Sequence, residues 1–245
     1  MFYLIGIGLY SEQDLSIKAI EIIKTCDKAY AELYTADINF NTKQFERLTN
    51  KKVQILKREQ IEQSNKFLEE AKTKNICLLV PGDPLFATTH LEILQRAKEK
   101  NIQFKIIHSS GIQTAIGETG LSLYNFGKIV SLPLPQKNFF PTSFYDIILQ
   151  NKKQGLHTLL LLDIGLDINH AIDILLEVEK QKKKGLFVKN LKIFGCAQLG
   201  SDMQMIKHCT IEEMKYCHLG KTPHTIVIPA KLTHYEEDFI KTFYN

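Results

Sequence analysis

Apolar and polar residues in the first half of the chain form two kinds of segment. Short apolar runs at 1–7, 28–34, 53–56, 76–80 and 103–107 have the length and composition of β-strands. Between them, apolar residues recur at helical spacing, as at Ile17, Ile20 and Ile23, and predict helices over 14–26, 60–73 and 85–100, the first with Asp14 as its N-cap. Strands and helices that alternate in this way predict a mostly parallel sheet with helices on both faces.

The second half alternates too, with more prolines between its elements. Strand-like runs lie at 127–134, 156–164, 191–197 and 225–229, and helical patterns begin at 144, cover 168–184 and return near 210–217. We interpret the lysines at 180–184 as a solvated helix end, because cations are favourable there. The predicted fold class is α/β, with two α/β domains at 1–110 and 111–245, antiparallel neighbours in the second domain and a hinge near 109–111.

Composition excludes several classes of protein. The 245 residues are 44% hydrophobic and 24% charged, as in ordinary folded domains, and the net charge of +4 gives little reason to expect nucleic acid binding. No apolar run approaches the roughly 20 residues of a membrane-spanning helix, and the first ten residues lack the basic start of a secretory signal. Five cysteines without a CxxC pair favour a reducing cytoplasm.

Two glycine-containing turns follow predicted strands, where ligands of α/β sheets usually bind. The first, Gly6-Ile7-Gly8, lacks the third glycine of a dinucleotide fingerprint, so we interpret it mainly as a sharp strand exit that needs backbone freedom. In the second, Pro81-Gly82-Asp83-Pro84, the prolines force a turn, and Asp83 is consistent either with a helix cap or with a ligand site. The negative charge of Asp83 disfavours phosphate.

Other candidate chemistry is weaker. His208-Cys209 and Cys217-His218 supply four potential zinc ligands, but their spacing fits none of the usual metal sites, so we predict no metal. The chain also lacks a nucleophile elbow that would indicate a hydrolase. We identify no catalytic residue from these patterns.

The strand 1–8 with its two glycines, the turn at 80–85 and the two-domain α/β order resemble the tetrapyrrole methylase family, whose members bind S-adenosylmethionine between two α/β domains. One branch of this family, in its archaeal form, methylates translation elongation factor 2 in diphthamide biosynthesis. Further matches to that branch lie at 1–10, 30–35, 82–90, 141–145 and 155–164. Because these matches are ordered along the whole chain, they are far more specific than the turn alone.

The resemblance implies cofactor contacts from both domains, at Leu9, Asp83, Phe86, Gly111, Ile112, Ile164, Leu199 and His224. It also implies elongation factor 2 as a protein substrate, a homodimer, and trimethylation of the amino group on a modified histidine. The stretch 138–143 is a candidate wall that would place apolar side chains beside the cleft, and the alternative interpretation is a loop packed on its own domain. Two alternatives stay open: methylation of a porphyrinoid carbon, and a non-catalytic module that binds the elongation factor.

Overall fold

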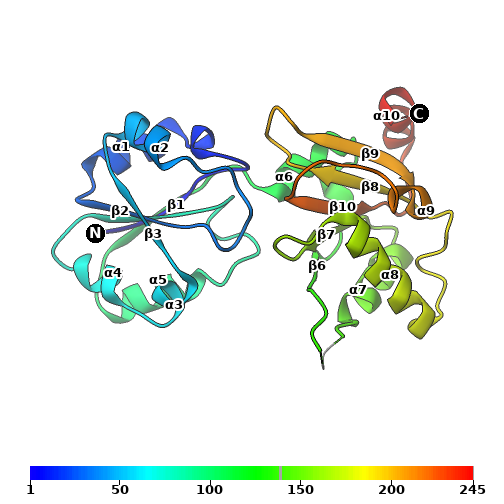
Figure 1. The fold of residues 1–245 in the computed structure, drawn as a ribbon, viewed down its shortest axis with the longest axis horizontal. Helices are drawn as coiled ribbons and strands as arrows, with labels where there is room; N and C mark the ends of the chain where they lie inside the picture. Colours follow the sequence, from blue (N-terminus) through cyan, green and yellow to red (C-terminus); the bar gives the residue numbers. More distant parts are fainter. Residues whose placement is uncertain (138–139, 245) are drawn as a thin grey trace. The chain divides into compact units, whose positions relative to one another are not determined.

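The chain divides into two compact units in a computed structural model that describes residues 1–137 and 140–244. The N-terminal unit is Met1–Ile112 and the C-terminal unit is Gln113–Asn245, whereas the expected boundary followed residue 110 (Figure 1). Each unit contains its own five-stranded sheet, so the α/β class is confirmed. No helix in the described residues is both long and apolar enough to span a bilayer.

The N-terminal sheet is entirely parallel, with the strand order β3-β2-β4-β1-β5. Its strands are β1 (Phe2–Gly6), β2 (Lys28–Glu32), β3 (Val53–Leu56), β4 (Ile76–Val80) and β5 (Phe104–Ile107). All five coincide with apolar runs of the sequence. Because the strands are parallel, their carboxyl ends lie along one edge of the sheet.

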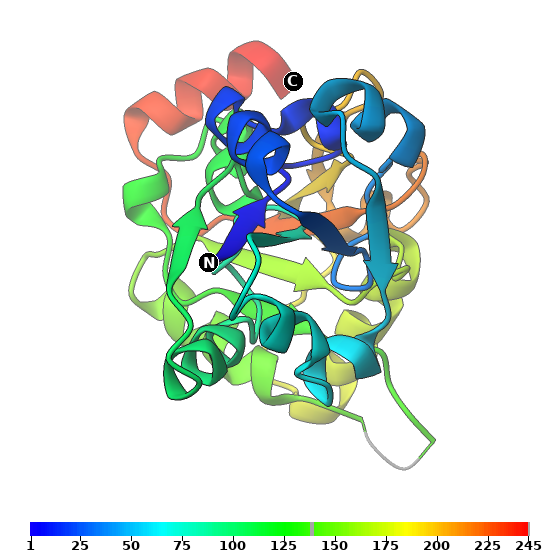
Figure 2. The ribbon, with the colours of Figure 1, turned by 90° about the vertical axis from the view of Figure 1, so that its left-hand side faces the viewer.

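Helices cover both faces of this sheet (Figure 2). One face carries α1 (Ile17–Thr25) and α2 (Thr42–Thr49), and the other carries α3 (Arg58–Glu62), α4 (Lys66–Glu70) and α5 (Leu91–Glu99) (Figure 1). Successive strand residues point to opposite faces, so Leu4 of β1 joins the core beneath α3–α5 while Ile5 joins the core beneath α1 and α2.

Two helix predictions in this unit are wrong in detail. Asp14 does not cap α1: it ends a short 3₁₀ turn, η1 (Glu12–Asp14), and the Ser16 hydroxyl caps α1 by accepting the Ala19 N–H at 3.1 Å. The helix expected over 60–73 is broken into α3 and α4. Arg96 of α5 stabilises the break by donating to the Ile61 carbonyl at 2.7 Å and the Ser64 carbonyl at 3.3 Å.

The helix expected over 85–100 begins only at Leu91, and His90 occupies its N-cap position. Residues 82–90 instead form an irregular segment at the carboxyl edge of the sheet. Asp83 accepts a hydrogen bond from the Leu85 N–H at 3.1 Å, which closes a tight turn, and Ala87 has a left-handed φ of 51°. An α-helix cannot pass through a left-handed residue, so the segment stays open until His90.

The C-terminal sheet has the order β6-β7-β10-β8-β9 and is antiparallel except between β6 and β7. Its strands are β6 (Val130–Leu132), β7 (Thr158–Leu162), β8 (Lys192–Ala197), β9 (Met205–Thr210) and β10 (His224–Ile228). The antiparallel neighbours expected for this half are therefore present. The sequence patterns missed β9, an edge strand with only half-buried and exposed residues.

Helices also flank the C-terminal sheet. Those packed on its main core are α7 (Ser143–Lys153), α8 (Ile168–Lys182) and α9 (Ile211–Met214); the remaining elements are α6 (Ile112–Ala115), η2 (Ile116–Thr119), η3 (Leu123–Asn125) and α10 (His234–Tyr244). Tyr244 of α10, a helix the patterns missed, packs edge-on against Phe194 on the opposite sheet face. The lysines at the end of α8 are solvent-facing, and Lys182 and Lys184 both pair with Asp146.

Candidate functional site

The segments that follow β1, β4 and β5 pack together at the carboxyl edge of the N-terminal sheet. Gly8 and Gly82 form a two-residue antiparallel bridge, with backbone N–H···O distances of 2.8 and 3.3 Å. A Cβ on Gly6 would lie 2.5 Å from the Gly82 carbonyl oxygen, and Gly8 has a φ of +115°. Bare backbone is required at both glycines, which confirms the interpretation of Gly6-Ile7-Gly8 as a strand exit that needs conformational freedom.

Asp83 is fixed by hydrogen bonds from two directions. Besides the Leu85 N–H, its carboxylate contacts the Ser109 N–H at 3.3 Å and His108 Nδ1 at 2.8 Å. A Cβ on Gly111 would lie 3.5 Å from the Asp83 nitrogen, so these two predicted site residues are neighbours. Asp83 therefore belongs to a turn that joins β4 to the segment after β5, and the alternative of a helix cap is wrong.

The other predicted contacts of this unit lie on the same segments. Leu9 directly follows the Gly8 bridge, Phe86 lies in the open segment after Asp83, and Ile112 begins α6. All three are half-buried, so part of each side chain faces solvent. The unit thus presents Leu9, Asp83, Phe86 and Gly111 along one edge of a parallel sheet, the usual position of an α/β ligand site.

The C-terminal unit brings its three predicted contacts to one end of its own sheet. β7 and β8 are both antiparallel to β10, so their carboxyl ends flank its first residue, His224. Ile164 follows β7 and is 44% exposed, whereas Leu199 follows β8 and is buried. The Gln198 N–H donates to the Pro223 carbonyl at 2.9 Å and holds the segment after β8 beside the start of β10.

His224 has the clearest sign of a missing ligand. Its Nδ1 accepts the Ile168 N–H at 3.1 Å, so the neutral ring carries its proton on Nε2. That Nε2 atom is buried and makes no well-aligned hydrogen bond among residues 1–137 and 140–244, although the backbone of Lys221 and Gly220 lies against the ring. Burial lowers the pKa of His224, which keeps the ring neutral near pH 7. A buried N–H without an acceptor is costly, and a bound molecule with a hydroxyl, carbonyl or ring nitrogen would satisfy it.

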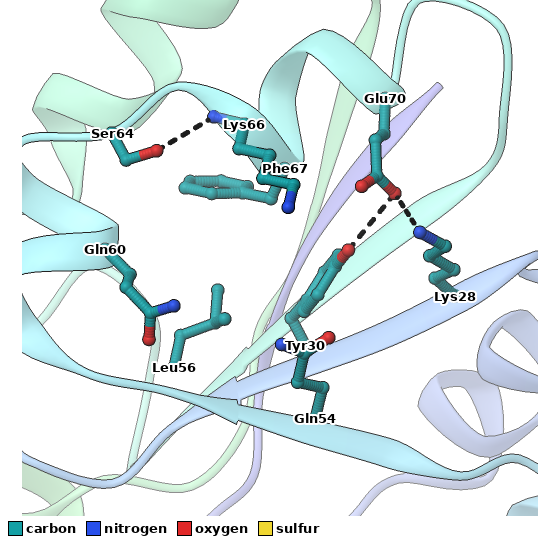
Figure 3. A pocket seen from close by; sticks show the side chains of 9 residues that line it. All are labelled: Lys28, Tyr30, Gln54, Leu56, Gln60, Ser64, Lys66, Phe67 and Glu70. Atoms are coloured by element: carbon teal, nitrogen blue, oxygen red, sulfur yellow. Dashed lines mark hydrogen bonds and ion pairs between the residues drawn. The ribbon is translucent and has the colours of Figure 1, made fainter.

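A separate pocket of about 130 Å³ lies on the N-terminal unit over β2, β3 and α4 (Figure 3). It is lined by Lys28, Tyr30, Gln54, Leu56, Gln60, Ser64, Lys66, Phe67 and Glu70. Three of its polar groups interact with one another, since Glu70 pairs with Lys28 at 2.6 Å and accepts the Tyr30 hydroxyl at 3.1 Å. Small-molecule pockets usually have roughly 300–1,000 Å³, so this one is too small for S-adenosylmethionine. No predicted site residue lines it.

Two further expectations concern other segments. Cys209 Sγ and Cys217 Sγ lie 3.9 Å apart, but the described part of the chain contains no group of three or more His, Cys, Asp or Glu side chains arranged to hold a metal ion. Residues 138 and 139, part of the predicted apolar wall at 138–143, lie outside the described residues.

The sequence reasoning missed His108, the ring that contacts Asp83, and the buried pair Glu32 and His90. Glu32 ends β2 and is fully buried, and His90 is 3% exposed. The available signal was Glu32, a carboxylate inside the otherwise apolar run 28–34, because carboxylates are seldom buried without a specific partner.

Residues 1–215 match the family described as Tetrapyrrole (Corrin/Porphyrin) Methylases. The match covers most of the chain, and the chain belongs to this family. Its members are methylases, so the predicted methyltransferase class is confirmed together with the family resemblance.

Within the family, the chain is similar over its whole length to proteins named diphthine synthase. That of Methanocaldococcus jannaschii is 39% identical over 251 residues, covering 98% of each chain. That of Methanosphaera stadtmanae is 40% identical over 250 residues, covering 99% of this chain and 95% of the relative. A crystal structure of diphthine synthase matches with a TM-score of 0.90 and 32% identity, covering 100% of this chain and 96% of the other.

Proposed function

We propose that this protein catalyses the diphthine synthase reaction. In this reaction, S-adenosylmethionine-dependent methylation converts the 3-amino-3-carboxypropyl-histidine of translation elongation factor 2 to its trimethylated form, diphthine, in diphthamide biosynthesis. The observation that carries the proposal is the similarity to diphthine synthases over at least 98% of the chain. A shared cofactor site alone would require similarity only around the glycine turns.

We further propose that the two sheet edges hold the cofactor, with Leu9, Asp83, Phe86, Gly111 and Ile112 from the N-terminal unit. Ile164, Leu199 and His224 would contribute from the C-terminal unit. The residues fit such a ligand: apolar side chains suit its adenine, the carboxylate of Asp83 suits hydroxyl or ammonium donors, and the unpartnered Nε2–H of His224 needs an acceptor.

When bound, the cofactor would supply a methyl group on a sulfonium, which is electrophilic without further activation. The protein's contribution is then to position the acceptor amine and to remove water from it. Desolvation lowers the pKa of an ammonium group and so favours the neutral amine that can attack. No covalent attachment to the enzyme is needed, and we assign no general base.

The proposal is tested with purified protein, labelled S-adenosylmethionine and elongation factor 2 that carries the unmethylated aminocarboxypropyl-histidine. We expect label on that histidine, a mass increase corresponding to trimethylation, and no label on a factor that lacks the precursor group. Methylation of a porphyrinoid with none on the factor would contradict the proposed substrate. Binding to the factor without methyl transfer would contradict the proposed enzyme.

A further inference from the structure

Glu32 and His90 form a buried pair at the same edge of the N-terminal sheet as Asp83, yet neither is among the predicted cofactor contacts. Glu32 Oε1 lies 3.5 Å from His90 Nε2, and the two side chains are 0% and 4% exposed. Burial raises the pKa of Glu32 and lowers that of His90 to about 4. Such a pair is expensive to bury, so the position calls for a specific role.

The pair ties together two segments that are far apart in the sequence. On the β2 side, Glu32 accepts the Thr35 hydroxyl at 2.6 Å and the N–H groups of Tyr34 and Thr35 at 3.1 and 3.2 Å. On the other side, His90 Nδ1 lies 2.7 Å from the Thr88 hydroxyl, and the Pro84 backbone faces the ring and favours its protonated form. The 3.5 Å contact between His90 Nε2 and Glu32 Oε1 is therefore the link between the open segment 82–90 and the end of β2.

The fastened segment is held in an unfavourable conformation. Ala87 has a φ of 51°, a left-handed conformation that is unfavourable for a non-glycine residue and persists only where the surroundings enforce it. Ala87 and Thr89 are exposed, whereas the Thr88 hydroxyl points to the buried ring of His90. The structure thus presents a short tip, with Ala87 and Thr89 exposed, at the edge of the sheet that carries Asp83 and Phe86.

The hydrogen bonds of Asp83 are independent of this fastening. Its carboxylate is held by Leu85, Ser109 and His108, none of which contacts Glu32 in the structure. Loosening the buried pair would therefore free the tip at 87–89 while these three hydrogen bonds of the Asp83 carboxylate remain. This separates the role of the pair from that of the cofactor contacts.

We infer that Glu32 and His90 are positioning residues that hold the tip 87–89 as the acceptor side of the methyl-transfer site, against which the amine-bearing side chain of the elongation factor is oriented. The inference rests on the proposed function, because it assigns a place to the acceptor of that reaction. Neither residue touches the acceptor itself, since both are buried beneath the tip.

The test compares wild-type protein with Glu32→Gln and Thr88→Val. The first variant replaces the Glu32 carboxylate by an amide of the same shape. The second removes the Thr88 hydroxyl that contacts His90 but keeps the branched side chain. Glu236→Gln is the matched control, because Glu236 forms a second buried carboxylate–histidine pair, with His157 at 3.1 Å, in the C-terminal unit. Each protein is examined for melting temperature, S-adenosylmethionine affinity by calorimetry, and kcat and KM with the modified elongation factor.

We expect kcat/KM for the factor to fall by about tenfold or more in Glu32→Gln and Thr88→Val, since misplaced reacting groups are costly. Their affinity for S-adenosylmethionine should stay within about threefold of the wild type, and Glu236→Gln should lose thermal stability with kcat/KM within about twofold. Wild-type kinetics in Thr88→Val, or a loss of cofactor affinity as large as the loss of kcat/KM, would overturn the inference alone. Absence of transfer by the wild-type protein would instead contradict the proposed function and, with it, the inference.

Discussion

His224 and Glu236 are both buried polar residues of the C-terminal unit, but only one of them has all its hydrogen bonds. Glu236 accepts from the N–H groups of Thr233 and Ser122 at 2.7 and 2.8 Å and from the side chains of Asn125 and His157. His224 has a buried Nε2 without a partner in the described residues. Full satisfaction indicates a structural role for Glu236, whereas the unpaired N–H of His224 indicates a ligand.

At this scale, we predict that His224→Asn weakens S-adenosylmethionine binding about tenfold, the typical effect of leaving a ligand group without its buried partner. The Asn oxygen can replace Nδ1 as acceptor for the Ile168 N–H, so the melting temperature should change little. Isothermal calorimetry with both proteins measures the difference. Equal affinity in a variant that melts as the parent does would remove His224 from the cofactor site.

Glu236 makes stability depend on pH in a defined direction. Burial alone would raise its pKa, but the hydrogen bonds from Thr233, Ser122, Asn125 and His157 outweigh burial and lower the pKa from 4.5 to about 2. Because the pKa is lowered in the folded state, the carboxylate stabilises the fold above pH 4.5. This stabilisation is lost as the pH falls from 4.5 towards 2.

We therefore predict that Glu236→Gln lowers the free energy of unfolding by up to about 3 kcal/mol at pH 7. The difference from wild type should be nearly unchanged at pH 5.5 and much smaller at pH 3. Urea unfolding at the three pH values measures it, with the exposed neighbour Glu237→Gln as control. A difference that is the same at pH 7 and pH 3 would contradict the assigned role of the carboxylate.

At the scale of elements, the irregular segments of the N-terminal unit contribute more residues to the candidate site than its regular helices and strands do. The open segment 82–90 carries Asp83 and Phe86 at the sheet edge, whereas an uninterrupted helix from residue 85 would have placed Phe86 in its first turn. The break between α3 and α4 is likewise specific, because the guanidinium of Arg96 satisfies backbone carbonyls that a continuous helix would have bonded itself.

Loss of the Arg96 guanidinium should destabilise the segment around the break between α3 and α4 before the rest of the unit. We predict that Arg96→Met, which retains the apolar stem, lowers the free energy of unfolding by about 1 kcal/mol, since partly buried carbonyls lose their donors. Hydrogen exchange should increase selectively over 58–70. The control is Lys98→Met, an exposed change on the same helix. Uniformly unchanged exchange over 58–70 in Arg96→Met would show that the break needs no such support.

At the scale of the whole molecule, the chain contains two sheets, each with its own apolar core. The two units therefore satisfy their internal packing separately. Several large side chains of the C-terminal unit remain outside any core: Tyr124 is 98% exposed, Tyr235 86% and Phe243 65%. Exposed aromatic groups of this kind are enriched at protein interfaces.

We predict that the protein is a symmetric homodimer, which would bury apolar surface of the C-terminal unit. Light scattering at low micromolar concentration should give a mass close to twice the chain mass of 28.1 kDa. The double variant Tyr235→Ser and Phe243→Ser should shift the mass towards that of one chain if these residues lie in the interface. A mass near 28.1 kDa for the wild type would contradict the dimer.

The sequence alone was sufficient to predict the strands of the N-terminal sheet and to identify the family. A parallel strand buried on both faces needs a nearly continuous apolar run, so Ile76–Val80 could be delimited from residue type. The need for bare backbone at Gly6 and Gly8 was also visible locally. The residues that match the family lie in ordered strings along the chain, and these strings can be recognised in the sequence without knowledge of the fold.

Only the tertiary structure decided where helices stop and which buried polar groups meet. The apolar spacing at 85–100 is helical, but the Asp83 turn and the left-handed Ala87 keep the chain open up to His90, which contacts Glu32 of another strand. The break after Glu62 depends on Arg96 from a later helix, and the orphaned Nε2 of His224 depends on which atoms surround it. These features are set by contacts between residues distant in sequence, and local periodicity contains no information about such contacts.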